Sequence, residues 1–444
     1  MFLLPLAVQT VLKKLNQSGF EAYLVGGCVR DFLLQKRPQD FDITTSATPE
    51  EMRRCFSGLK TVDTGVRHGT LTVLVDAMSI EVTTFRTEGV YSDHRRPDSV
   101  SFTRCLKKDL KRRDFTINAM AYHPETGLVD LFHGQSDLRQ KQIRCVGNAD
   151  KRFSEDALRM LRALRFASVL GFRVEKGTAE SLHKNRGLLK AIAGERIYSE
   201  LLKLLCGDEV LTILLCYPDV LSVVIPELQR TIGFEQNTPY HIYPVYEHIA
   251  HTVAAAKNEP VLRLTMLLHD IGKPLCYHED KKNIGHFFGH AKKSEELAKT
   301  ILCRLHADNV TTKRICTLIR LHSCDMSADE RWLRRFIRDW GLDVLLELIE
   351  VKIADNSAKN PDVLTRLDTF RAIRQNALSI ANRGECCTLK QLAVDGRDLM
   401  EVGVKPGVKL GQILHQLLDA VINNECINDR EALLAYAKQK LLVK

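Results

Sequence analysis

The chain has 444 residues, 45% of them hydrophobic and 27% charged, and a formal net charge of +9. This length predicts two to four domains, and the composition is that of an ordinary soluble protein. No apolar run is long enough to span a bilayer, which excludes a membrane-spanning helix, and the modest positive charge permits a polyanionic partner without requiring one. Thirteen scattered cysteines without a C-x-x-C pair favour reduced thiols, so we expect a cytoplasmic protein.

The first 140 residues predict an α+β head, a small mixed sheet with helices. A helix is expected from the N-terminus to about residue 20. Strands are predicted where β-branched and aromatic residues recur, at 23–25, 69–75, 80–85 and 128–132. The stretch between residues 86 and 100 is polar and is interpreted as a loop.

From residue 154 to the C-terminus the hydrophobic periodicity is helical, which predicts an all-α remainder. The architecture is therefore an α+β head followed by an all-α neck, body and tail. The predicted domains are a head at 1–140, a neck at 141–206, a helical body at 207–380 and a C-terminal tail at 381–444.

The turn after the first predicted strand carries two adjacent glycines, Gly26 and Gly27, and a helix is expected directly after them. Glycines at a strand-to-helix turn let the backbone approach a ligand closely. Backbone N–H groups at a helix N-terminus bind phosphate oxygens. The pattern predicts a phosphate-binding turn, the alternative being an ordinary turn.

Two carboxylates follow the turn at Asp40 and Asp42, two residues apart. On a strand this spacing points both to one face, with Phe41 on the other. Neighbouring acids repel each other, and a fold that keeps them usually offsets them with metal ions. We expect two Mg²⁺ ions here, one activating an attacking hydroxyl and one neutralising a triphosphate. Glu81 is the candidate third acid, and the alternative is a solvated strand end.

The pattern Gly26-Gly27-x-x-Arg30-Asp31 with Asp40-Phe41-Asp42 resembles the first motif of class II tRNA nucleotidyltransferases and bacterial poly(A) polymerases, within the polymerase-β-like superfamily. Later segments resemble the second motif, the flexible loop, the base-reading helix and the neck motif of that family, namely 112–120, 88–97, 155–159 and 195–201. The resemblance implies nucleotide binding by Gly26, Gly27, Arg30, Arg112, Arg113, Asp114, Asn118, Asp156, Arg159, Arg162, Arg165 and Arg196.

The base reader implied by the resemblance is the pair Asp156 and Arg159. Lying three residues apart, they are expected on one helix face. An aspartate accepts hydrogen bonds and an arginine donates several, so the pair can match the Watson–Crick edge of cytosine or of adenine. The alternative is a surface ion pair between Glu155 and Arg159.

The segment 64–73 resembles the CCA-adding members of the family, and the flexible loop is intact. The resemblance implies template-independent addition of C, C and A from CTP and ATP to the tRNA 3′ end, with release of pyrophosphate. Alternatives are an A-adding tRNA nucleotidyltransferase, a poly(A) polymerase or a non-catalytic RNA-binding protein. The implied partners are the tRNA acceptor end, CTP and ATP, with the protein a monomer or a homodimer.

The body carries a second candidate metal site. Its order His…His-Asp…Asp resembles the HD phosphohydrolase superfamily, which implies a transition metal or Mg²⁺ that activates water. The implied ligands are His248, His269, Asp270 and Asp355, with His290 and His322 for a second metal. One alternative is a body that keeps the fold without the chemistry. Another is a phosphatase or phosphodiesterase whose head only senses nucleotide.

The tail segment 396–411 resembles the C-terminal domain of Gram-positive-type CCA-adding enzymes. Its Gly-rich turn around Gly407 precedes a predicted amphipathic helix, and the backbone amides of such a turn can hold a phosphate. Lys405 and Lys409 add positive charge. We expect a tRNA-holding tail, the alternative being a simple helical cap.

Overall fold

The computed structural model describes residues 2–65, 68–89, 99–361 and 366–441. The chain forms two compact units, Met1–Gln229 with Arg304–Ala307, and Arg230–Cys303 with Asp308–Lys444. Most of the flexible loop predicted at 88–97 lies outside the described residues. Within the described part of the chain, no helix is both long enough and apolar enough to cross a membrane.

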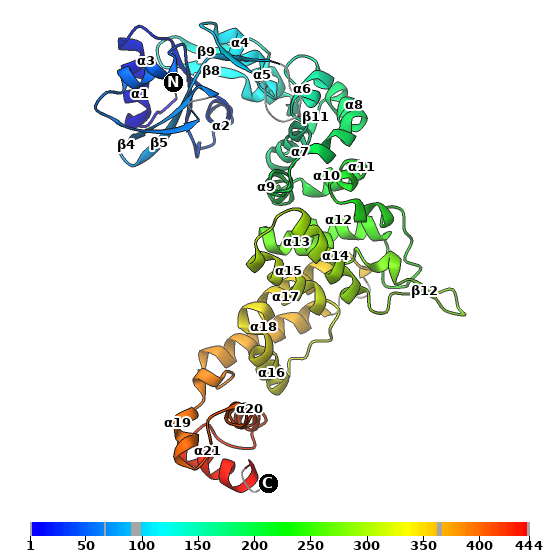
Figure 1. Ribbon diagram of the computed structural model, residues 1–444. Coiled ribbons are helices and arrows are strands. Elements are labelled where there is room, and N and C mark those ends of the chain that lie inside the picture. Colours follow the sequence, from blue (N-terminus) through cyan, green and yellow to red (C-terminus); the bar gives the residue numbers. More distant parts are fainter. Residues whose placement is uncertain (1, 66–67, 90–98, 362–365, 442–444) are drawn as a thin grey trace. The chain divides into compact units, whose positions relative to one another are not determined.

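A seven-stranded mixed sheet lies in the head of the first unit, with the strand order β3-β4-β5-β2-β1-β8-β9 (Figure 1). Its strands are β1 (Ala22–Val25), β2 (Asp42–Thr45), β3 (Lys60–Gly65), β4 (Thr70–Val75), β5 (Met78–Thr84), β8 (Met120–His123) and β9 (Gly127–Asp130). Strands β2 and β5 run parallel, whereas the other neighbouring pairs are antiparallel. The predicted mixed sheet and its four predicted strands are confirmed.

Helices of the head pack against this sheet, α1 on β1, α3 on β4, and α2 on β1 and β8. The head helices are α1 (Leu6–Gln17), α2 (Gly27–Leu33), α3 (Pro49–Cys55), α4 (Leu106–Lys111) and α5 (Gly134–Arg139), with the 3₁₀ turn η2 (Thr116–Asn118). Helix α1 buries Val8, Val11 and Leu15 on one side, which is the apolar stripe expected of an amphipathic helix. The predicted N-terminal helix is confirmed.

The segment after Phe85 differs from the predicted loop. Strands β6 (Arg86–Glu88) and β7 (Val100–Phe102) pair as a separate antiparallel ribbon. β6 is wholly polar and each strand has only three residues, so hydrophobic periodicity does not reveal a ribbon that backbone hydrogen bonds hold together. The neck also contains a short parallel pair, β10 (Gln142–Ile143) with β11 (Arg173–Val174), where only helices were expected.

The neck is otherwise helical, and α7 is its central element. Helix α7 packs against α9, and it ends at Gly171, whose φ of +69° is a left-handed cap. The neck helices are α6 (Ala149–Glu155), α7 (Leu158–Leu170), α8 (Lys176–Asn185) and α9 (Gly194–Leu205). The first unit continues through α10 (Val210–Cys216) and α11 (Pro218–Val224).

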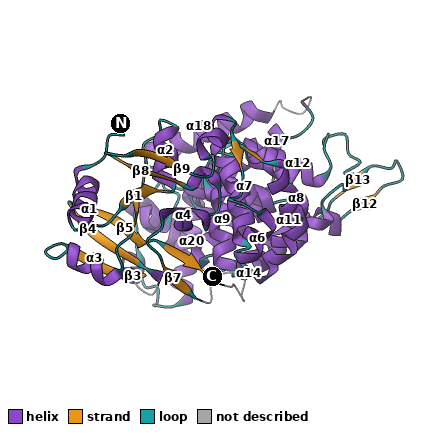
Figure 2. Cartoon of the chain, turned by 90° about the horizontal axis from the view of Figure 1, so that it is seen from above, coloured by secondary structure: helices purple, strands orange, loops and turns teal. Residues whose placement is uncertain are grey.

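In its described residues the second unit is helical apart from one short hairpin, β12 (His278–Glu279) with β13 (Gly285–His286), as Figure 2 shows. Its helices are α12 (Val245–Ala255), α13 (Pro260–Leu268), α14 (His290–Arg304), α15 (Asn309–Leu321), α16 (Glu330–Trp340), α17 (Leu342–Ser357), α18 (Arg366–Asn382), α19 (Gly396–Glu401), α20 (Val408–Ile422) and α21 (Arg430–Tyr436). Helices α12, α13, α15 and α17 pack against one another. The tail has its own apolar cluster, which includes Leu399, Leu417 and Leu433.

Candidate functional site

The turn between β1 and α2 brings the backbone close to two predicted site residues. Gly26 has a φ of +76°, a conformation that side-chain-bearing residues rarely adopt. A Cβ atom placed there would lie 3.5 Å from Nη1 of Arg113 and 3.7 Å from Oδ2 of Asp42. Gly27 is the first residue of α2, and both it and Arg30 line the cavity described below. The glycine pair therefore sits directly beside an acid and an arginine of the predicted site.

The sheet register places Glu81 directly beside Asp42, because β2 and β5 pair with these two residues opposite each other. Ile80 and Val82 are buried on the other face of β5, so Glu81 points with Asp42. Asp40 lies just before β2 rather than on it. Desolvation and the charges of Glu81 and Asp40 raise the pKa of Asp42, while the Arg113 guanidinium opposes them. A carboxyl whose pKa is raised by burial and by two neighbouring acids marks a site that favours cations.

A cavity of about 610 Å³ opens beside these acids, within the size range of small-molecule sites. Positive and negative side chains share its wall, and Phe166 and Val169 add an apolar part. The charged lining residues are Arg30, Asp31, Lys36, Arg37, Asp40, Asp42, Arg165 and Lys203. Five cations in this list face three carboxylates, so the wall has a positive excess suited to an anionic ligand.

A buried carboxylate that the sequence reading missed fixes two of the predicted arginines. Asp109 is 0% exposed and accepts a hydrogen bond from Nε of Arg112 at 2.9 Å and from Nη2 of Arg113 at 3.3 Å. Burial opposes its charge, yet the two guanidinium groups hold the pKa of Asp109 below its usual value. Arg112 also donates to Glu88 at 3.0 Å. The spacing Asp-x-x-Arg-Arg could have indicated these ion pairs, because residues three and four apart on a helix are neighbours.

A chain of charged contacts joins the head to the neck. Asp114 accepts from Nε and Nη2 of Arg162 at 3.0 and 2.7 Å, and from Nδ2 of Asn118 at 3.3 Å. Burial alone would raise its pKa, but the Arg162 guanidinium lowers the pKa of Asp114 to about 2. Arg162 and Arg165 both pair with Glu200 on α9, and Arg30 donates to Asn118 at 2.9 Å. Residues expected to bind nucleotide thus hold one another in position.

The predicted base-reading pair does not share one helix face. Asp156 is the C-terminal cap of α6, whereas Arg159 belongs to α7, which begins at Leu158. Asp156 accepts from Nη2 of Arg196 at 3.0 Å, and Arg159 donates to Glu155 at 2.8 Å. The expectation of a single continuous helix is therefore wrong, because the chain breaks the helix at Asp156 and Ala157. The Glu155 ion pair considered as an alternative is present.

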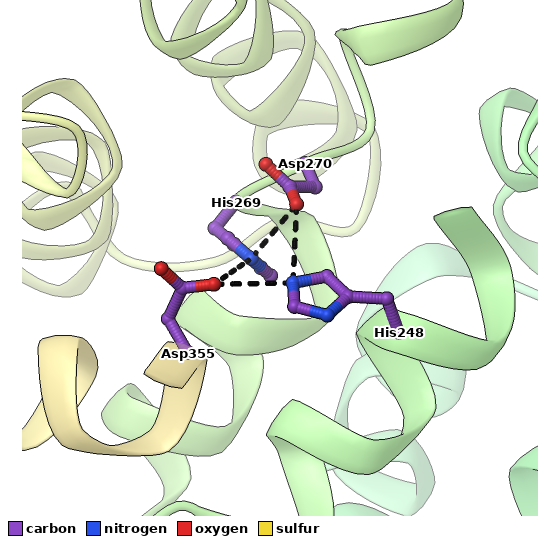
Figure 3. A group of neighbouring side chains, drawn as sticks. All are labelled: His248, His269, Asp270 and Asp355. Carbon is purple, nitrogen blue, oxygen red and sulfur yellow. Dashed lines mark hydrogen bonds and ion pairs between the residues drawn. The ribbon is translucent and has the colours of Figure 1, made fainter. Parts of the chain in front are cut away.

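The second unit brings together four buried side chains that could hold a metal ion, from three separate parts of the chain (Figure 3). His248 comes from α12, His269 and Asp270 follow α13, and Asp355 lies near the end of α17. Nε2 of His248 lies 3.4 Å from Asp270 and 3.1 Å from Asp355. Nε2 of His269 lies 3.2 and 3.8 Å from the same two carboxylates. The tertiary fold therefore brings together residues that are up to 107 positions apart.

A second group shares Asp270 with the first. His290 and His322 each place Nε2 3.5 Å from Oδ1 of Asp270, and the two Nε2 atoms are 3.1 Å apart. Within the described residues, these are the two groups whose possible metal-ligand atoms lie within 4.8 Å of one another. The three acids of the head are not among them. All six residues predicted for the body thus belong to two groups that share the carboxylate of Asp270.

The four imidazoles of this cluster have a defined orientation. Their Nδ1 atoms face backbone carbonyl oxygens, of Ala358 for His248, Met266 for His269, Phe287 for His290 and Ile319 for His322. A carbonyl oxygen only accepts hydrogen bonds, so each Nδ1 carries the proton and each Nε2 turns toward the centre. Orientation by a second hydrogen bond is characteristic of metal-binding histidines.

Buried polar atoms at the centre of this cluster lack hydrogen bonds. His269 and Asp270 are 0% and 1% exposed, and apart from ionic contacts within the cluster and with Lys273, Nε2 of His269 and both carboxylate oxygens of Asp270 have no hydrogen-bond partner among the described residues. Burial opposes a charge on His269, but Asp270 and Asp355 raise its pKa to about 9. Burial lowers the pKa of His290 to about 4, which favours the neutral form that binds metal. The donor set of imidazoles and carboxylates fits a divalent metal.

Three lysines next to the cluster were not recognised from the sequence. Nζ of Lys273 lies 2.6 Å from Asp270, and Nζ of Lys359 lies 2.5 Å from Asp355. Lys352 lines the same cavity. The signal was their spacing, since Lys273 follows Asp270 by three residues and Lys359 follows Asp355 by four.

Three family models match parts of the chain. The model described as "Poly A polymerase head domain" matches residues 22–144. The model described as "Probable RNA and SrmB-binding site of polymerase A" matches residues 171–231. The model for domain 2 of tRNA nucleotidyltransferases matches residues 277–437. These matches cover the head, part of the neck and most of the second unit.

Full-length relatives are similar to the whole chain. The CCA-adding enzyme of Lactococcus lactis subsp. cremoris is 34% identical, covering 98% of this chain and 96% of that protein. The CCA-adding enzyme of Ligilactobacillus salivarius is 37% identical, covering 97% and 95%. The crystal structure of the Bacillus stearothermophilus CCA-adding enzyme in complex with CTP has a TM-score of 0.74 and 30% identity, covering 98% and 96%.

Proposed function

The chain belongs to the family of CCA-adding enzymes, and from this we propose that it adds C, C and A to the 3′ end of tRNA without a template. CTP and ATP are the nucleotide substrates. In each step the terminal 3′-hydroxyl oxygen bonds to the α-phosphorus of the nucleotide. The bond between the α- and β-phosphates breaks, pyrophosphate leaves, and the hydroxyl proton is released.

The observation that carries this proposal is the cavity where acids and basic side chains meet. Asp42 and Glu81 lie opposite each other on parallel strands, beside the glycine turn and Arg113. A nucleoside triphosphate requires both kinds of group, cations for its phosphates and carboxylates for the ions that accompany it. Arg30 lines the same cavity and is held by Asn118. This combination supports nucleotidyl transfer.

A nucleotidyltransferase head uses divalent metal ions, and we assign Mg²⁺ to Asp40, Asp42 and Glu81. The raised pKa of Asp42 beside two other acids supports this assignment, because a cation removes that repulsion. Bound there, such ions would lower the pKa of the attacking hydroxyl and offset the charge of the departing pyrophosphate. Arg112 and Arg113, fixed by Asp109, are then placed to hold the triphosphate.

Base selection is assigned to Asp156 and Arg159, with Arg196 as the positioning residue. Asp156 is already paired with Arg196, and Arg159 with Glu155. Their polar atoms are therefore held by neighbours that a bound base has to replace or share. Arg162 and Arg165 support this region through Glu200. The break between α6 and α7 lets the two readers approach a base from different elements.

We retain the proposed division into head, neck, body and tail at 1–140, 141–206, 207–380 and 381–444. The tail is assigned to holding the tRNA acceptor end. Exposed Lys405 and Lys409 beside the turn at Gly407 support this role, because they offer charge to a phosphate backbone. The cytoplasm, where tRNA is matured, is the proposed location.

The direct test uses three tRNA transcripts, ending at the discriminator base, at C and at CC, each with labelled CTP or ATP. We expect C on the first two and A only on the third. Failure of A to enter the CC-ended transcript would contradict full CCA addition, and long A tails on any RNA would indicate a poly(A) polymerase. Asp42→Asn should abolish every addition, whereas Asp156→Ala should change the ratio of C to A.

We propose a second function for the body, a metal-dependent phosphohydrolase centre. Its support is the pair of ligand groups that share the buried Asp270, with four imidazoles oriented toward the centre. His248, His269, Asp270 and Asp355 would hold one divalent ion, and Asp270, His290 and His322 a second. Bound there, divalent ions would lower the pKa of water. Hydrolysis would form a bond between the water oxygen and phosphorus and break the bond between phosphorus and the ester oxygen, which would leave as an alcohol with a proton from the water.

Metal content and hydrolysis test this second function separately from the first. Protein freed of metal and then dialysed against Mn²⁺ or Co²⁺ should bind ions that the Asp270→Asn variant does not bind. The same substitution should abolish phosphate release from p-nitrophenyl phosphate and leave CCA addition intact. Equal metal content in the unaltered protein and in the Asp270→Asn variant would show that the histidine–aspartate cluster of the body is only structural.

A further inference from the structure

The aromatic ring of Phe166 on α7 contacts three arginines of the predicted nucleotide site. The Cζ atoms of Arg165, Arg30 and Arg162 lie 4.2, 5.2 and 5.4 Å from the ring centroid. Arg30 comes from α2 of the head, whereas the other two arginines come from α7 of the neck. A guanidinium group within about 6 Å of an aromatic ring is attracted by the negative charge of the ring face. One neutral side chain therefore contacts cations from both parts of the first unit.

Arg165 depends most on this ring. Its only ion pair among the described residues is with Glu200, at 2.9 Å, and it shares that carboxylate with Arg162. Burial lowers the pKa of Arg165, and so do the neighbouring guanidinium groups of Arg162 and Arg30. Glu200 and Asp114 oppose this shift. Arg165 therefore lies among like charges that one shared carboxylate only partly offsets, and the ring face supplies a further attraction.

Packing holds the ring in one orientation at the wall of the cavity. Phe166 is buried, and its ring meets the fully buried ring of Phe115 edge to face, with centroids 5.8 Å apart and an interplanar angle of 83°. Phe166, Arg30 and Arg165 all line the cavity that also contains Asp42. A ring that cannot turn presents its face in a fixed direction, so the guanidinium groups on it are in place before a ligand arrives.

We infer that Phe166 is a positioning residue for nucleotidyl transfer, whose ring holds the guanidinium groups of Arg30 and Arg165 in place to bind the triphosphate. This inference rests on the proposed addition of nucleotides, and it adds an uncharged residue to the charged ones proposed for that reaction. The triphosphate is common to CTP and ATP, so loss of the ring weakens both nucleotides equally and leaves the choice between C and A unchanged. It raises KM and leaves kcat unchanged, since groups fixed in advance bind substrate and transition state alike.

Steady-state addition by the full-length protein tests this role, with CTP on a C-ended transcript and ATP on a CC-ended one. Phe166→Leu keeps the apolar bulk without a ring face, and it should raise KM for each nucleotide about tenfold, the scale of a cation–π contact shielded from water. Phe166→Tyr keeps the face and should stay within about twofold of the unaltered protein. Tripolyphosphate, a competitor without a base, should inhibit the Phe166→Leu variant more weakly by the same factor.

Fluorination of the ring separates the attraction for cations from packing. Fluorine withdraws electrons from the ring face and changes the shape of the ring little. Analogues of Phe166 with one, two and three ring fluorines should therefore raise KM stepwise. Phe56 is the matched control, because it is 1% exposed at the end of α3 and has no cation over its ring among the described residues. The same analogues at Phe56 should leave KM unchanged, and circular dichroism verifies the folding of every variant.

Three results would overturn the inference while the proposed function stands. One is a KM that does not respond to fluorination although Phe166→Leu raises it, since that shows a packing role alone. The second is an unchanged KM, or unchanged inhibition by tripolyphosphate, in Phe166→Leu. The third is a changed ratio of C to A, which would assign the ring to the base. Absence of any addition by the unaltered protein would overturn the proposed function and the inference with it.

Discussion

Replacing Asp114 with asparagine should destabilise the first unit by an amount that depends on pH. In the folded chain the Arg162 guanidinium, opposing burial, lowers the pKa of Asp114 from 3.8 to about 2. This lowering of the pKa corresponds to roughly 2–2.5 kcal/mol in the free energy of unfolding at pH 7. For a unit of this size the melting temperature should fall by about 5–10 °C.

The sign follows from the direction of the shift. A carboxyl whose folded pKa is depressed stabilises the fold above its unfolded pKa, and this stability is lost as pH falls from about 4 to about 2. The deficit of Asp114→Asn relative to the unaltered protein should therefore be constant from pH 8 to pH 5. Near pH 3 it should fall to roughly half.

Calorimetric unfolding of the full chain at pH 7, 5 and 3 measures this deficit. Asp150→Asn is the matched control, because a lysine, a serine and an asparagine lower the pKa of Asp150 to about 2 at the surface. Solvent screens such contacts, so the control should show a much smaller deficit. A deficit for Asp114→Asn that is the same at pH 7 and pH 3 would refute the electrostatic reasoning.

Three further predictions concern the two sites. Gly26→Ala should lower the rates of C and A addition by a common factor, because its φ of +76° and the adjacent arginine disfavour a side chain; Gly58→Ala, at a φ of +90° with open space, should cost stability alone. Glu155→Gln should weaken the ion pair with Arg159, whose Nη1 lies 2.8 Å from the Glu155 carboxylate, and should change the ratio of C to A added in a competition assay. His290→Ala should reduce the metal content by one ion per chain, measured by elemental analysis. A loss of both ions, or of none, would contradict the proposal of two separate metal sites.

The sequence alone located much of the head. Alternation of β-branched residues predicted β4 and β5, and it predicted that Glu81 would face away from Ile80 and Val82, as the register shows. Local spacing works here because a strand alternates its side chains with a period of two. The ribbon of β6 and β7 escaped prediction because β6 is polar and each strand has only three residues, too few for the alternation in β7 to be recognised.

Helix continuity was harder to predict. Asp156 and Arg159 are three residues apart, yet they lie on different elements, because Asp156 caps α6 through its backbone and accepts the N–H of Leu158. An aspartate that bonds to nearby backbone competes with the helix and ends it. Propensity alone does not decide whether such a residue continues a helix or breaks it, since the ion pair with Arg196, forty residues later, also fixes its position.

The order of residues along the chain determined the chemistry of both sites, the acids and glycines of the head and the histidines and aspartates of the body. The tertiary structure alone decided which of them meet. Asp270 belongs to both groups of possible ligands because α12, α13, α15 and α17 pack together, which brings His248 and His322 to the same carboxylate. The buried Asp109 and the lysines around the second cluster acquire their roles for the same reason: a charge taken out of water requires a partner, and only packing places that partner within reach.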